Sequence, residues 1–143
     1  SENVYLKLDG AKVKTGKYLV HAIVNDDDAA TKVPEDMKLK CYGVNAVIAN
    51  GEYQGDIVND DTDRTMNVSI LNAKVTGVIT DAYISLEGSH WTAAGDSTVC
   101  LVGDVKESQL DAAAGVTIQA MAGEGCGLKG EYTLASGGKL VVA

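Results

Sequence analysis

The sequence of 143 residues contains no phenylalanine, one proline and one arginine. Because phenylalanine is missing, Val, Ile, Leu and Ala have to fill the core, and these small side chains stack well in a thin, layered interior. Long runs of strong helix formers are also missing, whereas Val, Thr, Ile and Tyr are abundant. The composition therefore favours an all-β protein, and the length is that of a single domain over residues 1–143.

Positive charge is scarce as well. The chain has 12 Lys and Arg against 20 Asp and Glu, a formal net charge of −8. This charge repels phosphate backbones and anionic lipids, so binding to nucleic acid or to a membrane surface is not expected. Arg64 is the single arginine, which leaves almost no material for bidentate recognition of carboxylate or phosphate groups. No stretch approaches the roughly 20 apolar residues that membrane insertion requires.

A repeated turn is the most informative feature that is present. An apolar residue, a short turn rich in Gly, Asn and Ala, and a second apolar residue five positions on recur along the chain. Residues 45–58 align with residues 67–80 without gaps, and residues 68–81 align in the same way with residues 84–97. The apolar pairs are Leu8 and Val13, Ile48 and Tyr53, Ile70 and Val75, Leu86 and Trp91, and, with one residue more, Leu134 and Leu140.

Four or five copies of one corner predict repeated architecture. The expected fold is a right-handed parallel β-helix (β-solenoid), in which the apolar pairs stack layer over layer. The same turn residues are also favoured in β-hairpins, so an antiparallel β-sandwich is the alternative. Coils are expected over residues 45–143. Residues 1–44 are less regular, because the acidic loop 25–37 interrupts them.

Residues 104–115 are the only candidate helix. Asp104 is a possible N-cap and Gly115 a possible C-terminal stop. The apolar face of this segment is weak, so a short helical turn or a loop between coils is an equal expectation.

Two acidic loops, residues 24–31 and 58–65, both begin with Val-Asn-Asp-Asp and end with Thr. Clustered carboxylates of this kind can hold calcium through hard oxygen ligands. Neither loop has the spaced carboxylates of an EF-hand, and the alternative is that the acidic residues only keep an edge solvated. The candidate metal ligands are Asp26, Asp28, Asp60, Asp61 and Asp63.

The chain has three cysteines. In an oxidising compartment Cys100 and Cys126 could form a disulfide, which would leave Cys41 free or available to another molecule. Free buried thiols are the equal alternative. No Cys and His spacing suggests a zinc site.

Catalytic residues are hard to assemble from this sequence. Ser89 and His90 are adjacent in a strand-like segment, so their side chains face opposite sides and cannot form a local triad. The pair Asp60 and Asp61 lies in a loop with no sign of a shielded pocket. No enzymatic activity is therefore expected.

A binding role is easier to support. Trp91, Tyr83 and Tyr132, with Tyr53, would form an aromatic strip for sugars if they were exposed. Because Trp91 and Tyr53 align with apolar core positions such as Val75, their burial is the favoured expectation. Tyr83 and Tyr132 are then the candidates for contact with a glycan.

Three segments, ISLEGSHWTAAGDSTV (84–99), SQLDAAAGVTI (108–118) and GEYTLASGGKLVV (130–142), resemble the repeats of autotransporter-type adhesin passengers and related bacterial surface proteins. The resemblance covers about residues 45–143 and implies a right-handed parallel β-helix. It also implies a structural or adhesive module at an extracellular or cell surface, with a glycan or host surface as a partner. The alternative is a carbohydrate-binding β-sandwich or a decoration or tail protein of a phage virion.

A solenoid ends in open backbone edges, which have to be capped or paired with another chain. Residues 4–8 and 139–143 are the terminal strand-like runs and are the candidates for such self-association. Head-to-tail pairing of these ends would build a filament.

Overall fold

The computed structural model describes residues 4–23, 43–61 and 63–143. Its regular elements are strands, apart from one short 3-10 turn, and this confirms the predicted all-β class. The first strands are β1 (Val4–Asp9), β2 (Lys12–Ala22), β3 (Gly43–Ala49), β4 (Glu52–Asn59), β5 (Thr65–Leu71), β6 (Lys74–Gly77) and β7 (Ile79–Glu87). The remaining elements are β8 (His90–Ala93), β9 (Ser97–Leu101), η3 (Glu107–Gln109), β10 (Leu110–Ala112), β11 (Thr117–Ala122), β12 (Gly130–Thr133) and β13 (Lys139–Val142).

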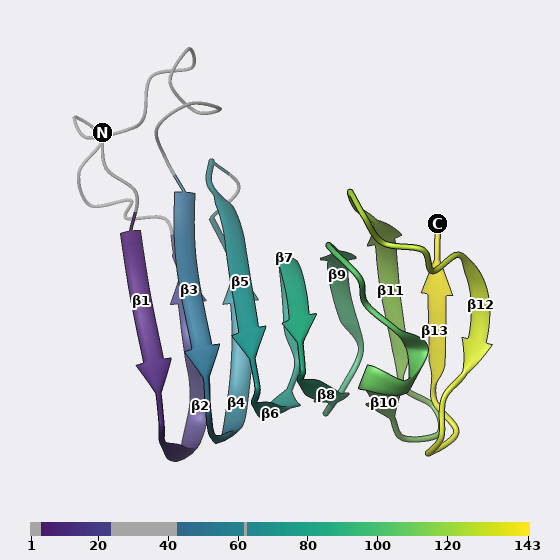
Figure 1. The fold of residues 1–143 in the computed structure, drawn as a ribbon, viewed down its shortest axis with the longest axis horizontal. Helices are drawn as coiled ribbons and strands as arrows, with labels where there is room; N and C mark the ends of the chain where they lie inside the picture. Colours follow the sequence, from purple (N-terminus) through teal and green to yellow (C-terminus); the bar gives the residue numbers. More distant parts are fainter. Residues whose placement is uncertain (1–3, 24–42, 62) are drawn as a thin grey trace.

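The strands belong to one strongly curled sheet. In Figure 1, β1, β3, β5 and β7 run side by side in front of β2 and β4. Every pairing between strands in the described residues is parallel, except that of β12 with β13. The alternative of an antiparallel sandwich is therefore wrong for this part of the chain.

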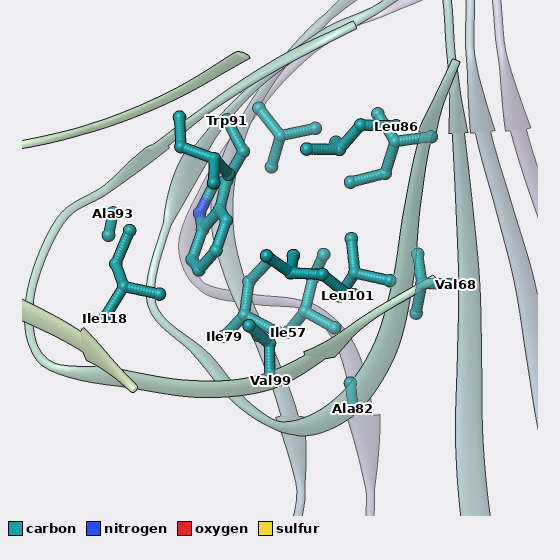
Figure 2. Close-up of a cluster of buried hydrophobic side chains, with 14 of the residues drawn as sticks. Ile57, Val68, Ile79, Ala82, Leu86, Trp91, Ala93, Val99, Leu101 and Ile118 are labelled. Atoms are coloured by element: carbon teal, nitrogen blue, oxygen red, sulfur yellow. The ribbon is translucent and has the colours of Figure 1, made fainter. Parts of the chain in front are cut away.

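The predicted rows of apolar residues are confirmed for four of the five pairs. The parallel register sets Leu8 beside Ile48, Ile48 beside Ile70, and Ile70 beside Leu86. The second members form another row, which is Val13, Tyr53, Val75, Trp91 and Leu110. These rows face the interior, and from Ile48 and Tyr53 onwards their members are buried. Figure 2 shows Leu86 and Trp91 in the same buried cluster.

The turns between these rows share one backbone feature. Gly10, Asn50, Asn72 and Gly88 each follow directly on a strand and have φ values of 70°, 52°, 49° and 60°. Glycine and asparagine tolerate this left-handed conformation better than other residues. The amide of each of the first three donates to a carbonyl at the end of a neighbouring strand, for example Asn50 to Leu71 at 3.0 Å. The Gly and Asn content of the repeat therefore reflects a turn that recurs from layer to layer.

The fifth predicted pair belongs to a different structure. Leu134 follows β12 directly, and Leu140 lies in β13, which pairs antiparallel with β12. Leu134 and Gly138 close this hairpin through a backbone hydrogen bond of 2.8 Å. The expectation of a further stacked corner is therefore wrong here, and the hairpin alternative is correct.

Two buried serine hydroxyl groups form hydrogen bonds between neighbouring turns of the chain. The Ser89 Oγ atom accepts a hydrogen bond of 3.0 Å from the Ala73 amide, and the Ser97 Oγ atom accepts one of 3.1 Å from the Ile79 amide. Both serines are buried. Each satisfies a main-chain donor of a buried residue, Ala73 or Ile79, and unsatisfied buried donors are costly.

The segment 104–115, the candidate helix of the sequence, contains only a short helical turn. The 3-10 turn η3 spans Glu107–Gln109, with Lys106 rather than Asp104 at the N-cap, and β10 follows at once. The Gln109 side chain accepts a hydrogen bond of 3.0 Å from the Lys106 amide. No helix in the described part of the chain is long and apolar enough to cross a membrane.

Chain segments of very different length connect strands that lie side by side. β1 pairs with β3, β3 with β5 and β5 with β7. The link from β2 to β3 includes all of residues 23–42. The link between β4 and β5 is the short loop 60–64. The pairings of β1 with β3, β3 with β5 and β5 with β7 have no register shift in spite of this difference.

Candidate functional site

The three aromatic residues proposed for binding lie in different environments. Trp91 is fully buried, which confirms the favoured expectation, so this member of the aromatic set does not contact a glycan at the surface. Tyr132 lies on β12, is half-buried against the core, and its phenol oxygen accepts a hydrogen bond of 3.3 Å from the Lys129 amide. Tyr83 lies on β7 and is 42% exposed. Tyr83 lines the groove described next.

This groove, called the Tyr83 groove below, crosses the outer face of four neighbouring strands, β7, β9, β11 and β13. Its volume is about 530 Å³. The residues that line it are Asp81, Ala82, Tyr83, Thr98, Val99, Cys100, Gln119, Ala120, Met121, Val141 and Ala143.

One wall of the Tyr83 groove is apolar. The parallel register sets Tyr83 beside Cys100 and Cys100 beside Met121. Met121 is 62% exposed, which is unusual for a side chain of this type. This wall therefore offers an aromatic ring and a thioether to a ligand.

The other wall is polar, and the floor between the walls is low. Thr98 lies beside Gln119 on this second wall, and Asp81 lies at its β7 end. Ala82, Val99 and Ala120 lie between the two walls, but their side chains are buried in the core on the other face of the sheet. The floor is therefore the main chain at these positions, because alternate residues of a strand face opposite sides.

Asp81 is held in place by an irregularity in β7. Its φ value is 55°, and the register of β7 with β9 shifts between Thr80 and Ala82. The Asp81 amide donates a hydrogen bond of 3.0 Å to Thr98 Oγ1, which in turn donates one of 2.9 Å to Asp81 Oδ1. The Asn59 side-chain amide also donates to the Asp81 carbonyl at 3.3 Å. These contacts fix a carboxylate at the rim of the groove.

The two cysteines of the predicted disulfide, Cys100 and Cys126, are free thiols in this structure. Burial raises the pKa of the Cys100 thiol, and the proximity of Cys126 raises it further. The two cysteines lie close enough for Cys126 to affect the Cys100 pKa, and both are half-buried. A disulfide between them stays a prediction. The thiol of Cys100 is protonated at neutral pH and forms part of the apolar wall.

The candidate metal ligands at residues 60–63 have protein partners. Asp60 Oδ2 lies 2.7 Å from His21 Nε2. The buried Asp61 carboxylate lies 3.3 Å from the Arg64 guanidinium and also accepts a hydrogen bond of 2.9 Å from the Asp63 amide. Within the described residues, no three His, Cys, Asp or Glu side chains gather in a group that could hold a metal ion. This arrangement does not support calcium at residues 60–63, and Asp26 and Asp28 lie outside the described residues.

A second candidate surface is the sheet edge formed by β1 and β2, called the open edge below. Among the described strands, β1 pairs only with β3, and β2 pairs only with β4. The inward apolar residues of this layer, Leu6, Leu8, Val13 and Leu19, are only partly buried. Tyr5 is 65% exposed.

At the opposite end of the sheet, the last strand is paired on both sides, whereas the sequence predicted a free edge there. β13 (Lys139–Val142) has β11 on one side and the antiparallel β12 on the other. Residues 139–142 are therefore not an edge strand, and the prediction that they are free to pair is wrong. β12 and β10 are the outermost strands at this end.

Known proteins provide no further guide to the site. No family model matches the chain, and neither a curated protein nor a solved structure matches it. The two surfaces above are therefore judged by their own chemistry.

Proposed function

We propose that this protein is a non-enzymatic structural module that assembles with other copies through its open edge. We further propose that its curled sheet is wound as a right-handed parallel β-helix. The in-register rows of apolar residues and the recurring left-handed turn support this winding. The observation that carries the assembly proposal is the incomplete burial of the apolar row at β1 and β2.

An open parallel edge favours association for two reasons. Among the described strands, none pairs with the outer side of β1 or β2, and a strand from another molecule can satisfy the main-chain donors and acceptors there. The open edge also leaves Leu6, Leu8 and Val13 partly in contact with water, and covering them would gain about 25 cal/mol for each Å² of apolar surface removed from water. In the equivalent row of the next layer, Ile48 and Tyr53 are buried. A further layer from another molecule would complete the first one in the same way.

The charges favour pairing of opposite ends. β1 and β2 carry four lysines, Lys7, Lys12, Lys14 and Lys17, and one aspartate, Asp9. Two open edges facing each other would bring like charges together, and lysine on an edge strand opposes that kind of pairing. The far end of the stack exposes Asp104, Glu107, Glu124 and Glu131, and the lysines Lys106 and Lys139 form ion pairs there with Asp104 and Glu131. This end has both signs of charge, so it repels the basic edge less than a second basic edge would. Contact between the two different ends is heterologous and would continue into a filament.

Such an assembly suits an extracellular or cell surface, as in the bacterial surface proteins that the repeats resemble. The module would then act as a stalk or adhesive element. The alternative is a structural role in a virion, as a decoration or tail protein. Both roles require self-association, and neither requires an active site.

Size measurement over a range of protein concentration tests the proposal. The monomer has a mass of 14.9 kDa. Light scattering after size exclusion should show a mass that rises with concentration and falls with added salt, because exposed charges are screened. Lys14→Glu should weaken the association at least tenfold. The matched control is Lys74→Glu, a change of the same charge at an exposed position in the middle of the stack. A monomer at every concentration would refute the proposal.

A further inference from the structure

We infer that the Tyr83 groove is a binding site for a neutral saccharide chain. This inference goes beyond the assembly proposed above. The groove lies on β7, β9, β11 and β13, whereas the open edge lies on β1 and β2.

The two walls of the groove match the two kinds of surface on a sugar. A pyranose ring has apolar faces of C–H groups and a rim of hydroxyl groups. The Tyr83 ring and the Met121 side chain offer the apolar contact, and aromatic rings supply much of the contact area in binding sites. Asp81, Thr98 and Gln119 offer a carboxylate, a hydroxyl and an amide to the sugar hydroxyls. Sites of this kind are mostly apolar, with a few polar groups that fix orientation.

The charge of the site selects a neutral ligand. Asp81 is the only charged side chain in the lining, and the whole chain carries a net charge of −8. Both repel an anionic polysaccharide. One carboxylate at the rim, already engaged by Thr98 through one oxygen, can accept hydrogen bonds from hydroxyl groups through the other.

The direction of the groove disfavours an extended peptide. Peptides that bind β-sheets gain affinity by pairing their main chain with a free strand edge. The groove instead crosses four strands whose main-chain groups already pair in the ladders β7–β9, β9–β11 and β11–β13. A ligand here is held by side chains alone, which suits a saccharide. Three strand spacings amount to about 14 Å, so the groove accommodates several sugar units rather than one.

Nuclear magnetic resonance titration of the ¹⁵N-labelled full chain tests this inference. The probes are cellohexaose, maltohexaose and hexa-N-acetylchitohexaose, each compared with its disaccharide. At least one hexasaccharide should shift the amides of Tyr83, Cys100 and Gln119, and should bind at least tenfold more tightly than its disaccharide. Tyr83→Ala should weaken this binding at least tenfold. Tyr5→Ala removes an exposed tyrosine side chain outside the groove and should leave this binding unchanged.

A second variant separates recognition from folding. Asp81→Asn keeps the shape of the side chain and should weaken binding severalfold, while the circular dichroism spectrum stays the same. Lys14→Glu should bind the saccharide normally even if it no longer associates, so failure of the assembly proposal and failure of this one are distinguishable. The inference is wrong if none of the hexasaccharides shifts the groove residues, if the shifts map elsewhere, or if a polyanion such as polygalacturonate binds equally well. Shifts at Tyr83 that depend on protein concentration alone would assign the groove to a second copy and would also overturn it.

Discussion

Trp91 and Gly77 are joined by a hydrogen bond of 2.9 Å from the indole Nε1 atom to the Gly77 carbonyl. Trp91 comes from β8 and Gly77 from the end of β6, the strand on which β8 stacks. The indole ring therefore fills the interior and also satisfies a main-chain acceptor of the neighbouring layer.

Replacement of this indole should be among the most damaging single changes. Trp91→Ala removes the largest fully buried side chain, and such truncations cost about 3–5 kcal/mol. Trp91→Phe should cost less, because it keeps much of the volume but leaves the Gly77 carbonyl without this donor. Urea unfolding followed by circular dichroism measures both. Tyr83→Ala, at an exposed position, is the control. Equal stability of Trp91→Ala and the unchanged protein would contradict the burial of the indole.

Gly77 itself should tolerate no side chain. A Cβ atom at this position would lie 1.8 Å from the Gly55 carbonyl oxygen in the adjacent strand β4. Gly77→Ala should therefore separate two layers or prevent folding. Gly16→Ala is a matched control, since a Cβ atom there meets nothing within 4 Å. Thermal unfolding should show a large loss for Gly77→Ala and a change within about 1 kcal/mol for Gly16→Ala.

The pH dependence of stability should include a contribution from Asp111. The hydroxyl and the amide of Ser136 donate to the Asp111 carboxylate, and these bonds lower the pKa of Asp111 below its usual value. Since the pKa is lower in the folded than in the unfolded chain, the contribution is present above the ordinary Asp pKa and is lost as pH falls through the folded value. Carboxyl titration by nuclear magnetic resonance should show this low pKa. In Ser136→Ala it should move back toward the ordinary value, and no movement would exclude the serine as the cause.

The Cys100 thiol should react slowly with alkylating reagents. Burial, and secondarily Cys126, raise its pKa, and only the thiolate is nucleophilic. In a variant with Cys41→Ser and Cys126→Ser, iodoacetamide should modify Cys100 more slowly at pH 8 than it modifies glutathione. The rate should keep rising with pH beyond the range in which glutathione levels off. A rate equal to that of glutathione would contradict the buried setting of the thiol.

The sequence was sufficient to predict the stacked rows because the repeat has two independent signals. The spacing from Ile48 to Tyr53 recurs at Ile70 and Val75, and the Asn or Gly between them marks the left-handed turn. The same local pattern at Leu134 and Leu140 forms a hairpin instead. Turn residues specify a reversal of the chain, but they do not specify whether the next strand pairs with its own predecessor or with a distant one.

The groove could be predicted only in part. The alternation around Tyr83 indicates that this side chain faces outward, as the structure confirms. Its neighbours Cys100 and Met121 depend on the order of β7, β9 and β11, which is a long-range property. The shift in register at Asp81 leaves no signal in composition or periodicity, because aspartate is also an ordinary loop residue.

The unequal links between stacked layers have a practical consequence for engineering. β1 and β3 keep their register across a long connection, and β3 and β5 keep theirs across a short one. The long link between β2 and β3, residues 23–42, is therefore a place where a foreign epitope or tag could be grafted without a change in the register of the strands on either side. If copies join end to end, each graft would be displayed at a regular interval along the fibre.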